Sequence, residues 1–289
     1  MPTNPTIGFI GLGLMGQAFT KRLVASGYTV TGFDIATEKI AQATKHGVIA
    51  ATSSADVTRS SDIVLLCVTS TDAVHEAVFG PGGVMESASA DKVLVDHSTT
   101  IVESTKDMAH TLHEQTGMGW VDAPVSGGPE GASNGTLAIM AGGTENDFCR
   151  VKPILDALGG NVVHVGGPGL GHTVKVINQL IVGLTIETVA EALTLAEKSG
   201  VDPRLVQQAL KGGFADSKIL QLHGSRMIDR SYVPGAKATI QLKDLKLAKA
   251  LASEAATELP HLASTMGLYE KLIARGDGDL DHSAIHKLL

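Results

Sequence analysis

Short runs of β-branched and apolar residues alternate with polar, alanine-rich segments of helical length over the first half of the chain. Turn residues bound each run, which is typical of strands that are buried on both faces of a parallel sheet. The alternation therefore predicts an α/β fold with a doubly wound sheet between Thr6 and about Val165. Strands are expected at residues 6–10, 29–33, 63–68, 93–96, 119–122, 137–141 and 161–165.

The hydrophobic pattern changes to the period of a helix in the second half of the chain. One long helix is predicted from about Leu170 to Ser199, where Gly200 ends the apolar repeat. Asp202 and Pro203 are a typical N-cap and first-turn proline, so they begin another helix. We therefore expect an α/β domain over residues 1–168 and an all-helical domain over residues 169–289, joined by the long helix. Further helices are expected up to Gly212-Gly213, over residues 243–258 and over residues 262–274.

Composition and charge narrow the class of protein. The 289 residues are 43% hydrophobic and 18% charged, so the chain is long and apolar enough for about two domains. The net charge of -7 and the few aromatic residues argue against nucleic-acid binding. No apolar stretch reaches the roughly 18 residues of a membrane span. The expected partner is therefore a small molecule. Only two cysteines are present, Cys67 and Cys149, which indicates a reducing, cytoplasmic location.

A glycine-rich motif follows the first predicted strand and begins a predicted helix. Its first glycine permits a tight turn, the second lets a pyrophosphate approach the backbone, and the third packs the helix against the strand. The helix N-terminus offers N–H groups and a positive dipole end to phosphates. This context predicts a Rossmann-type dinucleotide site rather than a glycine-rich turn without a ligand. The residues expected to bind the cofactor are Gly11, Leu12, Gly13, Leu14, Met15 and Gly16.

Asp34 ends the second predicted strand, near the place where an acid binds the adenosine ribose. Its charge would repel a 2′-phosphate, so we expect NAD as the cofactor, with NADP possible because Lys39 lies nearby. The alternative is that Asp34 only caps the following helix.

A polar loop follows the strand at residues 119–122, where ligands sit in open α/β sheets. Ser126 can donate its hydroxyl, and the N–H groups of Gly127 and Gly128 can bind a carboxylate. The alternative is an ordinary turn.

Three polar residues lie near the start of the long helix. Lys175, Asn178 and Gln179 are spaced i, i+3 and i+4, so they share one face among chiefly apolar neighbours. A lysine in such surroundings can exchange the proton that accompanies hydride transfer. The alternative is a solvated surface lysine.

The 11 histidines contain no metal-binding motif, and His110 and His113 lack a suitably spaced carboxylate. We expect no catalytic metal. His172 and His223 lie close to the motifs, and one interpretation is that they line the pocket, but a solvent-facing or hydrogen-bonded structural role is the more frequent one for such residues.

Four motifs in order give the chain a resemblance to the β-hydroxyacid dehydrogenase family, which includes 3-hydroxyisobutyrate dehydrogenase and tartronate semialdehyde reductase. Many relatives have Leu-Pro where Cys67-Val68 stands, and Asn178-Gln179 is more like the tartronate semialdehyde branch. The motifs are Ile10-Gly-Leu-Gly-Leu-Met-Gly16, Asp122-Ala-Pro-Val-Ser-Gly-Gly128, Gly169-Leu-Gly-His-Thr-Val-Lys175 with Asn178, and Lys243-Asp-Leu245.

The resemblance implies roles for individual residues. Lys175 is the implied catalytic lysine, and Ser126, Gly127 and Gly128 are implied to hold the substrate carboxylate. Asn178 is the implied substrate-orienting amide. By the same resemblance, Val68 and Thr99 lie at the cofactor, Thr99 near the nicotinamide ribose, and Lys243 reaches the cofactor or substrate.

The expected function is reversible hydride transfer between NAD(P) and a short 3-hydroxyacid or its semialdehyde. One alternative is an imine reductase of the same architecture, although those relatives generally carry Asp or Tyr where Lys175 stands. A phosphogluconate-type enzyme is a weaker alternative, and a non-catalytic nucleotide-sensing module belongs to a different class. The many apolar positions on the long helix predict a homodimer or homotetramer.

Overall fold

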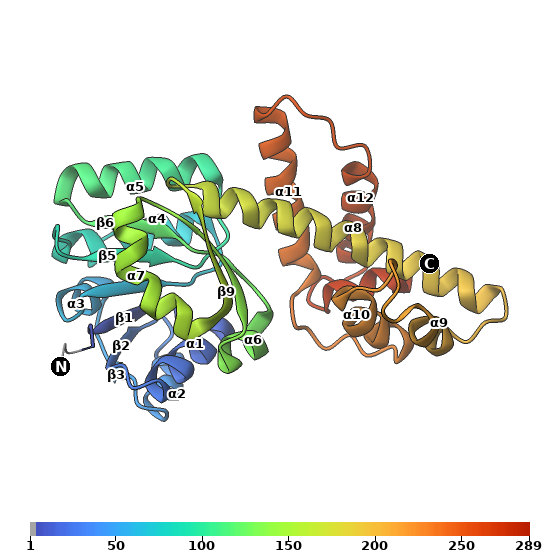
Figure 1. Cartoon of the computed structure of the whole chain (residues 1–289), viewed down its shortest axis with the longest axis horizontal. Helices are drawn as coiled ribbons and strands as arrows, with labels where there is room; N and C mark the ends of the chain where they lie inside the picture. The colour runs from blue at the N-terminus through green and yellow to red at the C-terminus, as the bar shows by residue number, and fades with distance from the viewer. Residues whose placement is uncertain (1–3) are drawn as a thin grey trace. The chain divides into compact units, whose positions relative to one another are not determined.

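The computed structural model describes residues 4–289, and the chain divides into two compact units, Met1–Lys175 and Val176–Leu289. The first unit is a sheet with helices on both faces, and the second is helical (Figure 1). Helix α8 (Leu170–Lys198) begins in the first unit and continues in the second. The domain boundary expected at residue 168 stays a prediction.

The sheet of the first unit has a parallel body and a reversed edge. Its strands follow the order β3-β2-β1-β4-β5-β6-β8-β7, with β9 paired to β8. Pairing is parallel from β3 to β6, as expected for a doubly wound sheet. The bounds are β1 (Ile7–Ile10), β2 (Val30–Phe33), β3 (Ile49–Ala50), β4 (Ile63–Leu66), β5 (Val93–Asp96), β6 (Gly119–Asp122), β7 (Val125–Ser126), β8 (Leu137–Gly142) and β9 (Gly159–Gly166).

The reversed edge differs from the uniformly parallel sheet that the apolar runs indicate. The chain turns back after β6 through β7 and the short helix α6 (Gly128–Asn134), and β8 pairs antiparallel with β6 and with β7. A parallel return to the neighbouring position needs a longer crossover, usually through a full helix. Such a crossover, α7 (Glu145–Leu158), does connect β8 to β9, which are parallel. Strands β3 and β7 have two residues each, too few to show a hydrophobic period.

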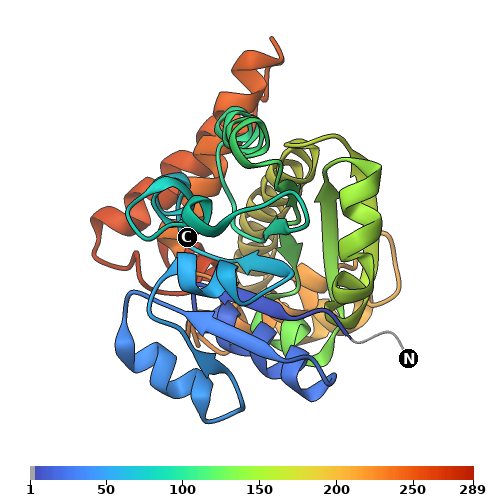
Figure 2. The same cartoon turned by 90° about the vertical axis from the view of Figure 1, so that its left-hand side faces the viewer.

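Two apolar clusters lie on opposite faces of the sheet. Alternate residues of β4 enter different clusters, Ile63 and Leu65 on one face and Val64 and Leu66 on the other, because side chains alternate along a strand. Both faces are thus buried, which explains the continuous apolar runs. Helices α1 (Leu14–Ala25), α6 and α7 cover one face, and α3 (Ser54–Arg59), α4 (Thr71–Phe79) and α5 (Val102–Thr116) cover the other, as the turned view shows (Figure 2). Helix α2 (Thr37–Thr44) follows β2.

The second unit confirms the helical prediction. Besides the continuation of α8, it holds α9 (Pro203–Leu210), α10 (Lys218–Ile228), α11 (Ala238–Glu254), α12 (Leu262–Ala274) and a 3-10 segment at His282–Leu288. Helix α12 has the predicted bounds, whereas α11 begins at Ala238 instead of residue 243. Helix α10 was not predicted, although Ser217 caps it by accepting a hydrogen bond from the Leu220 N–H.

Helix α8 is long and apolar enough, by length and composition, to cross a membrane, with a mean hydropathy of 1.4. Its buried residues Ile186, Val189 and Leu193 instead belong to the apolar interior of the second unit. Glu187, halfway along the helix, accepts a hydrogen bond from Thr265 of α12. A core helix of a globular unit accounts for these contacts.

Candidate functional site

The three glycines of the motif, Gly11, Gly13 and Gly16, differ in whether packing excludes a side chain at their position. Gly11 has φ +91°, and a Cβ there would lie 2.2 Å from the Cys67 carbonyl oxygen. A Cβ on Gly16 would lie 2.0 Å from the Gly11 carbonyl oxygen. Both positions therefore require glycine for packing. A Cβ on Gly13 would meet nothing within 4 Å, so the chain leaves open space at this glycine.

That open space lies at the start of α1. Gly13 is the N-cap residue of the helix, and no side chain caps the first turn. Leu12 is fully buried, Leu14 is 67% exposed and Met15 is half-buried. The first-turn N–H groups and the helix dipole fit an anionic pyrophosphate, so the residues present fit a dinucleotide.

Asp34 is tied to this loop. Its Oδ2 accepts a hydrogen bond of 2.7 Å from the Leu12 N–H, and its Oδ1 accepts one of 2.9 Å from Ala36. Ala36 is the N-cap residue of α2 and no side chain caps that helix, so Asp34 is not a helix cap. Lys39 Nζ lies 3.4 Å from Asp34 Oδ1. The carboxylate is thus buried and lies beside the glycine loop.

Val68 and Thr99 lie at the same edge of the sheet as the glycine loop. They follow β4 and β5, and β1, β4 and β5 are parallel neighbours whose carboxyl ends coincide. The Val68 N–H donates to Ser98 Oγ at 3.0 Å, which joins the two loops. The structure therefore brings together the cofactor residues predicted within the first unit.

The loop expected to bind a carboxylate contains two left-handed glycines. Ser126 ends β7 and pairs with Ala138 of β8. Gly127 has φ +132° and Gly128 has φ +64°, conformations that other residues rarely adopt. A Cβ on Gly128 would meet nothing within 4 Å, so its backbone is open to a small ligand.

The start of α8 is fixed to the end of β6. Asp122 accepts hydrogen bonds from the N–H groups of Gly169 at 2.7 Å and His172 at 2.8 Å. Burial raises the pKa of Asp122, an effect that His172 and these two N–H groups partly offset. A Cβ on Gly171 would lie 2.4 Å from the carbonyl oxygens of Asp122 and Met140, so only glycine allows this close approach.

Lys175 lies one helical turn after His172 and is 8% exposed. The alternative of a solvated surface lysine is therefore wrong. A lysine amine is one of the groups that serve as a general acid and base in enzymes.

The predicted residues of the second unit form a chain of polar contacts. Asn178 Nδ2 donates to Gln179 Oε1 at 2.8 Å, and Gln179 Nε2 donates to Asp244 Oδ2 at 2.7 Å. Lys243 Nζ lies 3.1 Å from the other oxygen of Asp244. Asp244, which the sequence analysis did not single out, thus joins the predicted amide to the predicted lysine.

A buried polar group in the first unit was also missed. Asp96 and Asp122 end neighbouring strands and pair in register, and the fully buried His172 ring lies between their carboxylates. Burial raises the pKa of Asp96. Burial also lowers the pKa of His97 to about 4, although the hydrogen bond to the Ala123 carbonyl oxygen partly opposes this shift. The sequence does contain a pattern that could have identified this group, because an aspartate stands at the carboxyl end of three strands. These residues are Asp34 directly after β2, Asp96 at the end of β5 and Asp122 at the end of β6.

His223, Asp281 and His282 lie close enough together to be considered as a metal site. However, the Arg226 guanidinium donates to Asp281 Oδ2 at 2.5 Å, and Gly235 and Ser283 also donate to this carboxylate. A resident cation already neutralises the only carboxylate of the group, so we assign no metal here. The expected absence of a catalytic metal stays a prediction.

Two family models together match nearly the whole chain. The NAD-binding domain of 6-phosphogluconate dehydrogenase matches residues 6–166. The NAD-binding domain of NADP-dependent 3-hydroxyisobutyrate dehydrogenase matches residues 169–289.

Similar individual proteins share the full length. The 2-hydroxy-3-oxopropionate reductase of Escherichia coli is 43% identical over 98% of this chain and 96% of its own. The 2-(hydroxymethyl)glutarate dehydrogenase of Eubacterium barkeri is 35% identical over 100% of this chain and 96% of its own. A crystal structure of 3-hydroxyisobutyrate dehydrogenase from Salmonella typhimurium superposes with a TM-score of 0.89 at 28% identity, covering 99% of this chain and 100% of that one.

Proposed function

We propose a specific reaction and catalytic residue for this chain, which belongs to the NAD(P)-dependent β-hydroxyacid dehydrogenase family. Family membership makes it an oxidoreductase that acts on a CH–OH group with NAD or NADP. The proposed reaction is reversible oxidation of a short 3-hydroxyacid to its semialdehyde, with Lys175 as the general acid and base.

The observation that carries the proposal is the burial of Lys175 at the start of α8, where the helix is fixed to the sheet. The bound dinucleotide supplies the hydride donor or acceptor at nicotinamide C4. Lys175 Nζ donates a proton to the substrate carbonyl oxygen during reduction and takes it back from the hydroxyl during oxidation.

Other residues bind and orient the two ligands. Ser126 Oγ and the backbone N–H groups of Gly127 and Gly128 hold the substrate carboxylate, which sets the carbon that receives hydride. We assign substrate orientation to Asn178 and a contact with cofactor or substrate to Lys243. The Gly11–Gly16 loop holds the pyrophosphate, and Val68 and Thr99 contact the cofactor, Thr99 near the nicotinamide ribose.

NAD is the proposed preferred cofactor. The Asp34 carboxylate lies beside the glycine loop and would repel the 2′-phosphate of NADP. Lys39 pairs with Asp34 and reduces this repulsion without removing it, so weaker activity with NADP is expected.

Tartronate semialdehyde is the proposed first substrate, because the Escherichia coli relative named 2-hydroxy-3-oxopropionate reductase is 43% identical over almost the full length. A steady-state panel tests this choice: tartronate, methylmalonate and succinic semialdehydes, glyoxylate and the corresponding alcohols, each with both cofactors. The highest kcat/KM is expected for tartronate semialdehyde with NADH. A higher value for another semialdehyde would replace the substrate but keep the reaction class.

The same panel separates the alternative functions. An imine reductase would reduce cyclic imines faster than any semialdehyde, and the lysine at position 175 argues against that chemistry. A nucleotide-sensing module would quench NADH fluorescence without turning over any substrate of the panel, and the buried Lys175 argues against a purely binding role.

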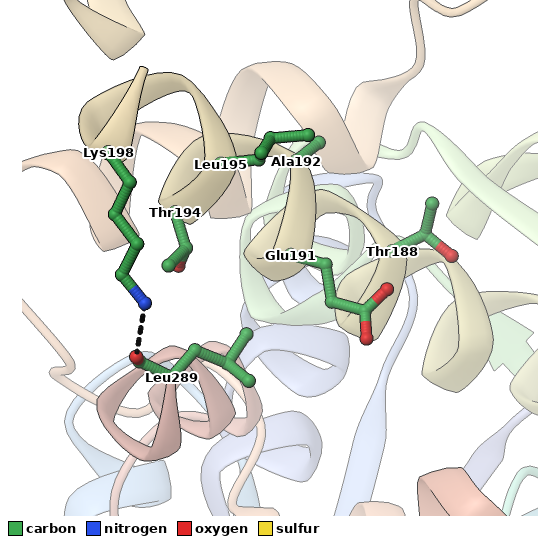
Figure 3. A pocket seen from close by; sticks show the side chains of 7 residues that line it. All are labelled: Thr188, Glu191, Ala192, Thr194, Leu195, Lys198 and Leu289. Atoms are coloured by element: carbon green, nitrogen blue, oxygen red, sulfur yellow. Dashed lines mark hydrogen bonds between the residues drawn. The ribbon is translucent and has the colours of Figure 1, made fainter. Parts of the chain in front are cut away.

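We further propose a cytoplasmic homodimer or homotetramer that associates through α8. Ile181 and Leu195 on this helix are 59% and 66% exposed, and such apolar exposure is typical of association surfaces. A surface hollow of about 530 Å³ lies beside Leu195 (Figure 3). Its lining also includes Thr188, Glu191, Ala192, Thr194, Lys198 and Leu289.

Light scattering tests the association. The wild type is expected to be a dimer or tetramer, and Leu195→Glu is expected to shift it toward monomer, because a charge buried in an apolar interface is costly. Glu191→Gln, a neutral change in the same hollow, is the matched control. A wild type that stays monomeric at all concentrations would contradict the proposal.

A further inference from the structure

We propose that His172 is a positioning residue for Lys175, acting through a buried set of hydrogen bonds that joins the first turn of α8 to the ends of β5 and β6. The proposal rests on the proposed function, in which Lys175 is the general acid and base. It assigns His172 no contact with substrate or cofactor.

The backbone of His172 provides the first attachment. Its N–H and that of Gly169 donate to the two oxygens of Asp122, at 2.8 and 2.7 Å, so one carboxylate holds the start of α8. Asp122 is itself fully buried at the end of β6. A carboxylate that accepts two backbone N–H groups at a helix start fixes the helix axis at this point.

The imidazole provides a second attachment to a different strand. His172 Nε2 lies 2.8 Å from the Ser98 carbonyl oxygen, in the loop after β5. A carbonyl can only accept, so Nε2 carries a proton and donates. Nδ1 lies 3.1 Å from the hydroxyls of both Thr100 and Thr105, which themselves lie 2.7 Å apart. Every polar atom of the ring therefore has a partner.

One aspartate carboxylate lies near each nitrogen of the His172 ring. Asp96 Oδ2 lies 3.9 Å from Nε2, and Asp122 Oδ2 lies 3.8 Å from Nδ1. Asp96 Oδ2 has no hydrogen-bond partner among residues 4–289, although the atom is buried. A buried oxygen without a partner is costly, so a ring held close to it is stabilising. His97 is the other titratable ring in this region, and it bonds to the Ala123 carbonyl oxygen instead.

The contacts of His172 fix the first turn of α8 and therefore the position of Lys175. His172 and Lys175 are spaced i and i+3 on α8 and lie on adjacent turns of one helix face. A displacement of the first turn would therefore move the lysine with it. Misplacement of a reacting group by about 1 Å can cost about 100-fold in rate.

The first test compares two substitutions at this position. His172→Ala is expected to lower kcat about 100-fold and to raise the Kd of NADH by a much smaller factor. His172 contacts neither the glycine loop nor Asp34, but it bonds to Ser98 and Thr100, which flank the proposed cofactor residue Thr99. His172→Gln keeps an N–H donor for the Ser98 carbonyl and is expected to recover most of the rate. NADH binding is followed by the fluorescence of Trp120, the only tryptophan.

The matched control is Thr173→Ala. Thr173 is the next residue of the same helical turn and is half-buried, and its hydroxyl donates to the Gly169 carbonyl oxygen just before α8. This variant is expected to keep kcat within about threefold, since a change on the same turn does not touch the strand ends.

A double-mutant cycle with Lys175→Gln shows whether His172 acts through the lysine. His172→Ala is expected to cost nothing further once Lys175 is replaced. A loss of equal size in both backgrounds, or equal rates for the Ala and Gln variants, would overturn the positioning role. If Lys175→Gln alone retains the wild-type rate, the proposed function has failed, and this result is separate from either outcome at His172.

Discussion

The two units place their exposed apolar side chains differently. In the first unit, Leu14 and Ile35 are 67% and 93% exposed, and both adjoin residues proposed to bind the cofactor. In the second unit, exposed apolar residues spread over several helices, among them Ile181 on α8, Leu205 on α9 and Phe214 after α9. The comparison teaches that the two most exposed apolar side chains of the first unit lie where a small ligand is proposed to bind, although Ile49 and Val163 are exposed elsewhere in that unit. The second unit exposes more apolar surface than a small ligand covers, which favours a protein partner.

The units differ also in what their buried carboxylates do. In the first unit, Asp122 holds the start of α8, close to the proposed catalytic lysine. In the second, Asp281 joins Arg226 of α10, Gly235 of the following loop and Ser283 of the C-terminal 3-10 segment. Under the proposed function, the first arrangement positions the catalytic lysine, whereas the second joins three segments of the second unit.

The largest expected effect is on the stability of the second unit. Asp281→Ala leaves the Arg226 guanidinium and the N–H and O–H donors of Gly235 and Ser283 without their acceptor, and breaking such a buried pair costs about 3–5 kcal/mol. Urea unfolding of the variant measures the loss. Asp279→Ala is the control, since Asp279 forms an exposed ion pair with Lys237 and is expected to matter little. Equal effects of the two substitutions would show that Asp281 stabilises the fold no more than an exposed ion pair does.

The same carboxylate has a defined pH dependence. Burial alone would raise the pKa of Asp281, but the nearby rings of His223 and His282 and the hydrogen bonds from Ser283 and Gly235 hold it well below its ordinary range. A lowered folded-state pKa contributes stability above the unfolded pKa of about 4, and this contribution is lost as the pH falls toward the folded value. Acid unfolding monitored by circular dichroism should therefore begin below about pH 4 for this contact. In Asp281→Ala, that pH-dependent contribution should be missing.

A pair of glycine variants sharpens the comparison within the first unit. Gly16→Ala places a Cβ against the Gly11 backbone and is expected to cost about 1–3 kcal/mol of stability, as overpacking does. Gly13→Ala enters open space and is expected to leave stability within about 0.5 kcal/mol while weakening NADH binding. Thermal unfolding and NADH titration of both variants test this. Normal NADH binding by Gly13→Ala would place the pyrophosphate elsewhere.

A smaller effect is expected on cofactor choice. Asp34→Ser removes the charge that opposes a 2′-phosphate, so the ratio of kcat/KM for NADP to that for NAD should rise at least about tenfold. Lys39→Gln should move the ratio the other way, because Lys39 pairs with Asp34. An unchanged ratio in Asp34→Ser would mean that this carboxylate does not select the cofactor.

The smallest expected effect involves the cysteines and leaves the fold intact. Two effects raise the pKa of the Cys67 thiol to about 12, mainly burial and secondly the negative charge of Asp96. Cys149, by contrast, is exposed to solvent. A disulfide reagent at pH 8 should label Cys149 in the native protein and both thiols after unfolding. Rapid native labelling of Cys67 would show that the end of β4 is more open than the structure indicates.

The sequence predicted the parts of the fold that depend on local pattern. Apolar runs identified the seven longer strands, and the 3.6-residue period identified α8 and α12. The reversed direction of β8 depends on how the chain returns over the sheet after β6, which no local period encodes. Helix α10 was missed because Gly224 interrupts its apolar pattern, although this glycine packs closely against Gln207.

The site was predictable where one motif supplies the chemistry. The glycine loop, Asp34 and Lys175 could be singled out because their neighbours along the chain explain their environment. For His172 the sequence indicated a solvent-facing or hydrogen-bonded structural role, but it could not identify the partners Ser98, Thr100 and Thr105, which lie about 70 residues away in sequence. Only the pairing of β5 with β6 brings these residues to the start of α8.

Lys175→Ala tests the central claim most directly. The variant should bind NADH with wild-type affinity, because the glycine loop and Asp34 are untouched, and should lose about 10²- to 10⁴-fold in kcat, as expected for a general acid and base. Single-turnover reduction of tartronate semialdehyde, with NADH binding measured on the same sample, gives both quantities. If the folded variant retains more than about a tenth of the wild-type rate, Lys175 is not the proton donor.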